Sequence, residues 1–285
     1  MLDTVVSSAR ERGEEAVVVT FWPHPRTVLQ QDARDLRLLT SLEEKKALLS
    51  SVGIDRVEVI PFTRSFAALT AAQYLAKLQA DYGATLVVMG YDNHIGSDQL
   101  TAGQIRASQT LSDLPSVLQV DECHSGPFGH TDSFCHSERS EESVSSTVIR
   151  RKLSEGQVEE ACAMLGYAYE LYGVVVAGNR MGRTIGFPTA NMQLYEPLKL
   201  VPGNGVYSVE VEVLGRQYRG MCNIGMRPTV DGKSRTIETH ILDFDEDIYG
   251  LPLRLHFLRR IRDERRFSSL EALRLQLEKD REACR

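Results

Sequence analysis

Residues 178–191 read Gly-Asn-Arg-Met-Gly-Arg-Thr-Ile-Gly-Phe-Pro-Thr-Ala-Asn, and this stretch guides the interpretation of the whole chain. Its three glycines, Gly178, Gly182 and Gly186, permit positive φ angles and let a ligand approach the main chain closely. Arginines beside such a loop suit phosphate, because guanidinium presents a planar fork of donors. We interpret the segment as a phosphate cradle; the alternative is a glycine-rich turn with solvated arginines.

The end of the same stretch supplies oxygen atoms that could bind a metal ion. Pro188 lacks an N–H and fixes φ, so we expect an extended segment after it. In such a segment Thr189 and Asn191 project to one face, because strand side chains alternate. A hydroxyl and an amide carbonyl are hard ligands, which Mg²⁺ prefers beside nucleotide phosphates. The sequence therefore predicts a magnesium site at these two residues.

The Gly-Phe-Pro-Thr-Ala-Asn end of this stretch resembles the signature of the riboflavin kinases. The loop of that family reads Gly-x-x-x-Gly-Arg-x-x-Gly-Phe-Pro-Thr-Ala-Asn, and every fixed position is matched here. The resemblance implies that Mg²⁺ is held by Thr and Asn together with ATP. The residues it assigns to ATP and phosphate binding are Gly178, Gly182, Arg183, Gly186, Phe187, Pro188, Thr189 and Asn191.

Composition limits the class of protein. The chain has 285 residues, 42% of them hydrophobic and 25% charged, which is typical of a soluble globular protein of two domains. The net charge of -6 argues against general nucleic-acid binding, and no run approaches the roughly 20 apolar residues of a membrane helix. Five scattered cysteines fit reduced thiols in a cytoplasm. We expect small-molecule partners; the sequence does not predict the oligomeric state.

Residues 1–121 alternate between helical and strand patterns. This alternation predicts an α/β domain with a parallel sheet and ligands at the carboxyl ends of its strands. The loops at 22–25 and 91–96 follow two of these strands. The expected helices are 2–12, 41–52 and 70–82, and the expected strands are 16–21, 57–62 and 86–90.

The same region resembles the bacterial bifunctional flavin enzymes, which join an FMN adenylyltransferase domain to a riboflavin kinase domain. Residues 20–25 match their Thr-Phe-x-Pro-His-Pro loop, and 90–96 match Gly-x-Asp-x-x-x-Gly, with Ile95 where Phe is common. Residues 145–150 resemble the Ser-Ser-Thr-x-x-Arg phosphate motif of nucleotidyltransferases; the alternative is an ordinary helix cap. The resemblance implies adenylyltransferase roles for Phe21, Pro23, His24, Asp92, Ser145, Ser146, Thr147 and Arg150.

One motif of that family has no counterpart. Its adenylyltransferase domain begins with a strand and a Gly-x-Phe-Asp-Gly-x-His-x-Gly-His loop, which this sequence lacks. We therefore expect an N-terminally truncated chain, an incomplete Rossmann-like nucleotidyltransferase domain at 1–153, and doubtful FMN adenylyltransferase activity. Within it, residues 122–144 are rich in Ser, Glu, Gly and His and predict a disordered insertion. Its Cys and His residues fit no standard zinc spacing.

Residues 160–285 change to strands and turns. Short strand-like runs separated by glycine-containing turns predict a compact antiparallel barrel. An amphipathic helix is expected from 268 to about 282, with Leu270, Leu273 and Leu277 facing inward. The resemblance covers this region without a gap and implies the riboflavin kinase fold, a small barrel with a helix. The expected strands are 169–177, 205–214, 217–224, 235–244 and 253–258.

Glu238 is the candidate catalytic base. Strand alternation puts Ile237 and Ile241 on one face and Glu238 with His240 on the other. The alternative is a solvated strand carboxylate, but the resemblance implies that the glutamate of this Glu-x-His strand is catalytic. It also implies a flavin-contacting flap and a loop at the site, with flavin-binding residues Asn223, Arg227, Arg262, Glu264 and Phe267.

Together these patterns predict a riboflavin kinase, which transfers the γ-phosphate of ATP to the 5′-hydroxyl of riboflavin and yields FMN. Mg²⁺ and ATP are the expected cofactors. One alternative is the full bifunctional enzyme, which also makes FAD. A second is a flavin-binding protein without catalysis.

Overall fold

The computed structural model describes residues 1–29, 35–90, 92–108, 113–120, 144–178, 181–229 and 232–285. The predicted insertion lies outside these residues except for Val144, as do its cysteines and histidines. Contacts divide the chain into two compact units, Met1–Leu36 with Thr40–Cys135, and Arg37–Leu39 with His136–Arg285. Each unit is described by itself.

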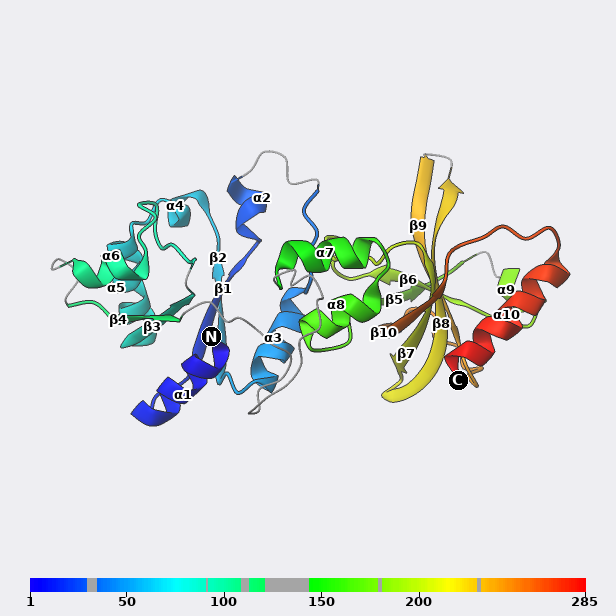
Figure 1. Cartoon of the computed structure of the whole chain (residues 1–285), viewed down its shortest axis with the longest axis horizontal. Coiled ribbons are helices and arrows are strands. Elements are labelled where there is room, and N and C mark those ends of the chain that lie inside the picture. Colours follow the sequence, from blue (N-terminus) through cyan, green and yellow to red (C-terminus); the bar gives the residue numbers. More distant parts are fainter. Residues whose placement is uncertain (30–34, 91, 109–112, 121–143, 179–180, 230–231) are drawn as a thin grey trace, which may run out of the picture. The chain divides into compact units, whose positions relative to one another are not determined.

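The first unit alternates helices and strands (Figure 1). The capping boxes at Ser41 and Thr70 start two of its helices. Gly83 ends the helix that Thr70 starts, and Gly13 ends the first helix, both in the left-handed conformation. Its elements are α1 (Leu2–Arg12), β1 (Val17–Trp22), α2 (Pro25–Leu29), α3 (Leu42–Ser51), β2 (Arg56–Pro61), α4 (Arg64–Ala67), α5 (Ala71–Tyr82), β3 (Leu86–Gly90), α6 (Ala102–Ala107) and β4 (Ser116–Val120).

The strands of this unit do not form the single sheet that the sequence predicted. Within the described residues, β1 pairs in parallel with β2, and β3 pairs in parallel with β4, giving two separate two-stranded sheets. Each sheet has a small core of its own. A cavity of about 790 Å³ is lined by largely apolar side chains of both β1 and β3. The periodicity predicted β1, β2 and β3 and their parallel sense, but it predicted neither β4 nor which strands would pair.

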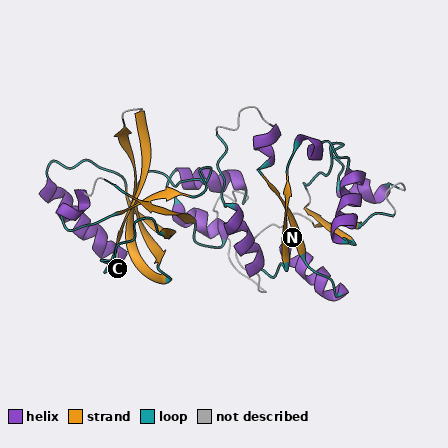
Figure 2. Ribbon diagram, turned by 180° about the vertical axis from the view of Figure 1, so that it is seen from behind, coloured by secondary structure: helices purple, strands orange, loops and turns teal. Residues whose placement is uncertain are grey.

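The second unit contains the barrel (Figure 2). Six strands close in the order β10-β5-β6-β9-β8-β7, and every neighbouring pair is antiparallel, which confirms the predicted architecture. The elements are α7 (Ser146–Ser154), α8 (Val158–Leu165), β5 (Glu170–Val176), α9 (Met181–Thr184), β6 (Ala190–Leu194), β7 (Gly205–Val213), β8 (Arg216–Thr229), β9 (Gly232–Ile241), β10 (Pro252–Arg262) and α10 (Leu270–Cys284).

Alternation along the strands fills the barrel. Leu171 and Val175 of β5 and Leu253, Leu255 and Phe257 of β10 are almost fully buried, while the residues between them are partly exposed. Removing these side chains from water is the main stabilising contribution of the fold. Among the described helices, none is long and apolar enough to cross a membrane.

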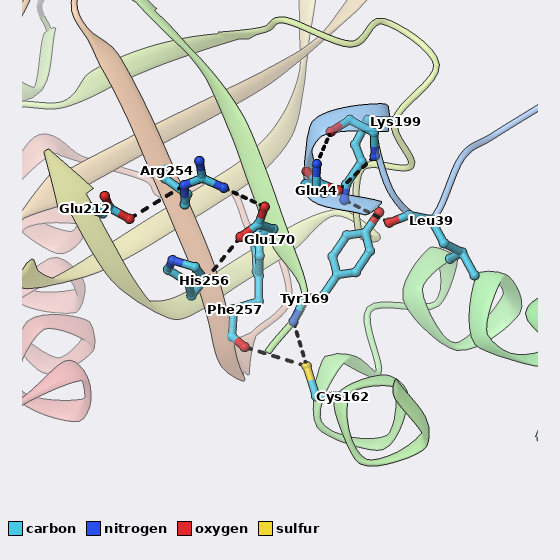
Figure 3. Close-up of polar contacts among 11 residues, drawn as sticks. Leu39, Glu44, Cys162, Tyr169, Glu170, Lys199, Glu212, Arg254, His256 and Phe257 are labelled. Atoms are coloured by element: carbon cyan, nitrogen blue, oxygen red, sulfur yellow. Dashed lines mark hydrogen bonds and ion pairs between the residues drawn. The ribbon is translucent and has the colours of Figure 1, made fainter. Parts of the chain in front are cut away.

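Polar contacts join α8 and the outer side of β5 and β10 (Figure 3). The Cys162 sulfur accepts the Tyr169 N–H at 3.2 Å and lies 3.7 Å from the Phe257 carbonyl, and burial raises the pKa of this thiol. Arg254 on β10 bonds the Glu170 carboxylate at 2.7 Å. The contacts of Cys162 hold α8 against the barrel, and the Arg254–Glu170 contact joins β10 to β5.

The C-terminal helix α10 attaches through a buried ion pair. Arg262 of β10 bonds Asp280 with Nε–Oδ1 at 3.1 Å and Nη2–Oδ2 at 2.7 Å, and Asp280 is 1% exposed. Leu277 packs beside it, but Leu270, predicted to face inward, is 58% exposed. The prediction was wrong for Leu270 because the inward face of α10 runs through Leu277, Asp280 and Cys284.

We predict that Asp280→Ala destabilises the barrel unit by about 3 kcal/mol, because a buried guanidinium loses its partner. Urea unfolding of the purified protein measures this. The matched control is Glu278→Ala on the same helix, where the ion pair with Arg274 is exposed, and a loss within about 0.5 kcal/mol is expected. Equal losses in the two variants would contradict the prediction.

Candidate active site

Glu238 lies in the middle of a row of polar side chains across three strands. In the barrel register it is directly opposite Asn191 of β6 and directly opposite Asn223 of β8. Side chains directly opposite in antiparallel strands share a face, with Cβ atoms about 4.5–5.5 Å apart. All three residues are half-buried. The structure therefore places a carboxylate between two amides, as a proton acceptor flanked by neutral hydrogen-bonding groups.

The glycines of the 178–186 loop allow it to pack against this row. A Cβ at Gly178 would overlap the Asn191 side chain, and one at Gly182 would overlap the Phe187 carbonyl. Gly186 adopts φ 82°, which a residue with a side chain rarely does. Close backbone approach, inferred from the sequence, is thus present at Gly178 and Gly182, and both contacts are to the 187–191 segment.

A cavity of about 440 Å³ lies beside the row and is lined by Arg183, Pro188 and Thr189. Thr239 also lines it, and its buried hydroxyl oxygen makes no hydrogen bond. Asn191 and Glu238 are not among the lining residues, because strand alternation turns them to the opposite face from Thr239. The structure thus brings Thr189 together with Arg183 of α9 at the cavity, and Asn191 of β6 together with Glu238 of β9.

The far wall of this cavity was missed by the sequence analysis. It is formed by the segment 244–249 after β9, which includes the acidic run Asp245-Glu246-Asp247. The run was visible in the sequence as three consecutive carboxylates. All three residues are exposed, and nothing local indicated that they would also line a cavity with Arg183.

The donor set near Thr189 and Asn191 fits Mg²⁺ in its chemistry. Mg²⁺ commonly takes only one or two protein oxygens and completes its octahedron with water and phosphate oxygens. A hydroxyl, an amide carbonyl and the neighbouring Glu238 carboxylate provide such oxygens. Among the described residues there is no cluster of three His, Cys, Asp or Glu side chains that would hold a metal without substrate. A metal bound here would therefore depend on the nucleotide.

Phe187 and His240 form a support under the loop. Phe187 is 4% exposed, and its ring lies 5.2 Å from the His240 ring and 5.6 Å from the Arg281 guanidinium of α10. His240 Nδ1 lies 2.8 Å from the Pro188 carbonyl, which can only accept, so Nδ1 carries the proton. Burial lowers the His240 pKa, and the hydrogen bond to Pro188 opposes this shift.

The predicted flap lies across β8. A Cβ at Gly225 would overlap the Glu264 carboxylate, and it would lie 3.4 Å from Asn223 Nδ2. Glu264 therefore sits against the backbone of β8, beside the row that contains Glu238. Among the other residues predicted to bind flavin, Arg262 is paired with Asp280 and stacks over Phe267 with its guanidinium 5.7 Å from the ring centre. The Arg227 side chain lies outside the description.

Three of the four predicted adenylyltransferase residues of the first unit lie at the end of β1, and the fourth, Asp92, follows β3. Phe21 packs on Phe62 and Phe66 with ring centroids 5.4 and 5.3 Å away. The Trp22–Pro23 peptide is cis, and His24 Nδ1 accepts the Arg26 N–H at 3.2 Å. Asp92 is exposed.

The remaining predicted adenylyltransferase residues, on α7, belong to the second unit. Ser145 caps α7 by accepting the Val148 N–H at 3.3 Å, and Ser146 and Thr147 form its first turn. Arg150 Nε donates to the Arg37 carbonyl at 2.9 Å.

Comparison with protein families matches both halves of the chain. The family model described as riboflavin kinase matches residues 165–285, and the one described as FAD synthetase matches residues 1–124. The second match does not support the doubt that the sequence analysis raised about an adenylyltransferase domain.

Individual relatives cover nearly the whole chain. The chain is 34% identical to a bifunctional riboflavin kinase/FMN adenylyltransferase of Bacillus subtilis over 99% of its own length and 85% of that protein. The corresponding Escherichia coli protein is 33% identical over 98% of the chain and 85% of its own length. A crystal structure from Streptococcus pneumoniae, named a macrolide-efflux protein, matches with a TM-score of 0.85 and 33% identity over 99% of the chain and 87% of its own. These coverages do not bear out the predicted N-terminal truncation.

We predict that the stability of the barrel depends on pH through His240. The pKa of His240 is lowered in the folded protein. Its contribution to the free energy of unfolding is therefore complete above about pH 6.5, the pKa of an unfolded histidine, and is lost as the pH falls through the folded pKa. Between pH 7.5 and 5 the native protein should lose more stability than His240→Gln, whose amide can still donate to Pro188. Urea unfolding at both pH values measures the difference, and parallel losses would refute it.

Proposed function

The chain belongs to the bifunctional riboflavin kinase/FMN adenylyltransferase family, and from this premise we propose that it phosphorylates riboflavin to FMN and adenylylates FMN to FAD. The observation that carries the kinase half is the register that sets Glu238 directly opposite Asn191. A phosphotransferase acting on an alcohol needs a base beside the hydroxyl and oxygen ligands beside the phosphates. This pair of strands supplies both from adjacent positions.

In the proposed reaction Glu238 accepts the proton of the ribityl 5′-hydroxyl, whose oxygen then attacks the γ-phosphorus of ATP as the bond to the β-phosphate breaks. Asn191 and Thr189 hold the metal and nucleotide in place. Mg²⁺, when bound, offsets the negative charge of the transferring phosphoryl group. Arg183 at the cavity mouth adds a planar donor fork for the phosphate chain.

The flavin ring is proposed to lie across β8. Glu264 is positioned there as an acceptor for an N–H at the edge of a heteroaromatic ring, and Asn223 lies beside it. Phe267 offers an apolar edge, with the guanidiniums of Arg262 and Arg265 at 5.7 and 4.9 Å from its ring centre. A ligand spanning Glu264 and Glu238 would place its ring beside Asn223 and its hydroxyl tail at the middle of the row.

The adenylyltransferase half is supported by the FAD synthetase match at residues 1–124 and by relatives that are bifunctional along their length. We propose that Phe21, Pro23, His24 and Asp92 serve this second reaction. A flavin-binding protein without catalysis is disfavoured, because such a protein needs no carboxylate opposite Asn191.

We predict that Glu238→Gln lowers FMN formation by about 10²–10⁴-fold, the usual contribution of a general base. Purified protein, riboflavin, ATP and Mg²⁺ suffice for the assay, with products separated by chromatography. Glu210→Gln on β7 is the matched control and should retain the full rate. If Glu238→Gln keeps the native rate, or the native chain forms no FMN, the kinase assignment is wrong.

We also predict that the two activities separate. With FMN supplied in place of riboflavin, Glu238→Gln should form FAD at the native rate, because its base serves only the first reaction. His24→Ala should show the reverse, with FMN formation retained and FAD formation reduced at least tenfold, the rate equivalent of about 1.4 kcal/mol. If the native protein supplied with FMN forms no FAD, the adenylyltransferase proposal is wrong and only the kinase proposal remains.

A further inference from the structure

The turn that precedes β7 is held rigidly, although the site described so far makes no use of it. The Gly203 N–H donates to the Leu153 carbonyl at 2.8 Å, and the Gly203 carbonyl accepts the Tyr207 hydroxyl at 2.5 Å. The carbonyl of Asn204 accepts Arg260 Nη2 at 2.7 Å. Three elements therefore fix the backbone from which the Asn204 side chain projects.

The side chain of Asn204 bridges two charged groups. Its Oδ1 accepts Arg235 Nη2 at 3.1 Å, and its Nδ2 donates to Glu264 Oε2 at 3.2 Å. Arginine only donates and a carboxylate only accepts, so the amide oxygen of Asn204 must face Arg235 and its NH₂ group must face Glu264. Arg235 is itself anchored on the carbonyls of Val201 and Pro202 at 3.2 and 2.5 Å.

The other oxygen of Glu264 is confined as well. It lies where a Cβ of Gly225 would be, against the backbone of β8, two residues from Asn223. Glu264 is otherwise exposed, and an exposed glutamate samples many rotamers. One contact from Asn204 and one from Gly225 therefore restrict its carboxylate to a single place beside the Asn191–Glu238–Asn223 row.

We infer that Asn204 is a positioning residue of the flavin site, which holds the Glu264 carboxylate in the orientation that accepts an N–H from the imide edge of the ring. This inference rests on the proposed kinase function. An amide suits the task because it separates Arg235 from Glu264. A direct ion pair would turn the carboxylate toward the arginine, whereas the intervening amide leaves one oxygen available to the ligand.

The proposal predicts a pattern across three variants. Asn204→Ala should raise the dissociation constant and KM of riboflavin about fivefold, the usual net value of one hydrogen bond, with kcat and the KM of ATP within about twofold of native. Asn204→Asp should bind riboflavin more weakly still, because two carboxylates then face each other. Gln193→Ala, at an exposed position of β6, is the control and should behave as native.

A reciprocal exchange tests the orientation itself. Glu264→Gln alone should weaken riboflavin binding. The carbonyl oxygen of the new glutamine turns toward the Asn204 NH₂ group, so the glutamine NH₂ group faces the ring N–H of riboflavin, and two donors cannot form a hydrogen bond. In Asn204→Asp/Glu264→Gln the new aspartate accepts that NH₂ and returns the carbonyl to the ligand. The double variant should therefore bind riboflavin more tightly than either single variant.

Quenching of riboflavin fluorescence gives the dissociation constants, steady-state rates give the two KM values, and thermal melting reports folding. Unchanged riboflavin affinity in Asn204→Ala, a parallel rise in the KM of ATP, or a double variant no better than the singles would each overturn the inference. A native chain that binds riboflavin but forms no FMN would refute the kinase proposal while the binding pattern still decides the role of Asn204. A native chain that does not bind riboflavin would overturn both.

Discussion

The antiparallel register of β6, β9 and β8 is the constraint on which the rest of the site depends. Side chains alternate with a period of two, so a slip of one residue would turn Glu238 into the barrel and Thr239 out of it. Ile237 and Ile241, each 5% exposed, oppose such a slip because they would lose their place in the core. Closure of the barrel adds to this, since no strand has a free edge along which to shift.

Much of the barrel unit could be predicted from local sequence. Short runs of period two between glycines gave the strands, and the two isoleucines gave the face on which Glu238 lies. What could not be predicted depends on contacts between distant segments. Asn204 meets Glu264 across 60 residues of chain, and no local pattern records such a pair. Asp280 was also missed, because a charged residue in a surface helix is ordinarily exposed.

The first unit shows a different limit. Its three longer helices and first three strands were predicted with small errors at the ends, but the short helices α2, α4 and α6 and the strand β4 were not predicted. The pairing of strands was not predicted either, because parallel neighbours are chosen by packing across helices rather than by turns. The missing histidine loop led to a prediction of truncation and lost activity. A missing motif concerns one stretch of the chain, whereas the matches to relatives extend over nearly all of it. These matches do not support the prediction that was drawn from the missing motif.

The C-terminal helix α10 has a consequence for how variants of this protein are interpreted. Through Arg281 it touches the ring under the glycine loop, and through Asp280 it holds the strand end from which the flap continues. One helix thus contacts the edges of both proposed substrate subsites. Substitutions on the buried side of α10 would alter the apparent affinities for nucleotide and flavin in parallel. A mutational study that measured the affinity for only one substrate would wrongly assign these α10 residues to the pocket of that substrate.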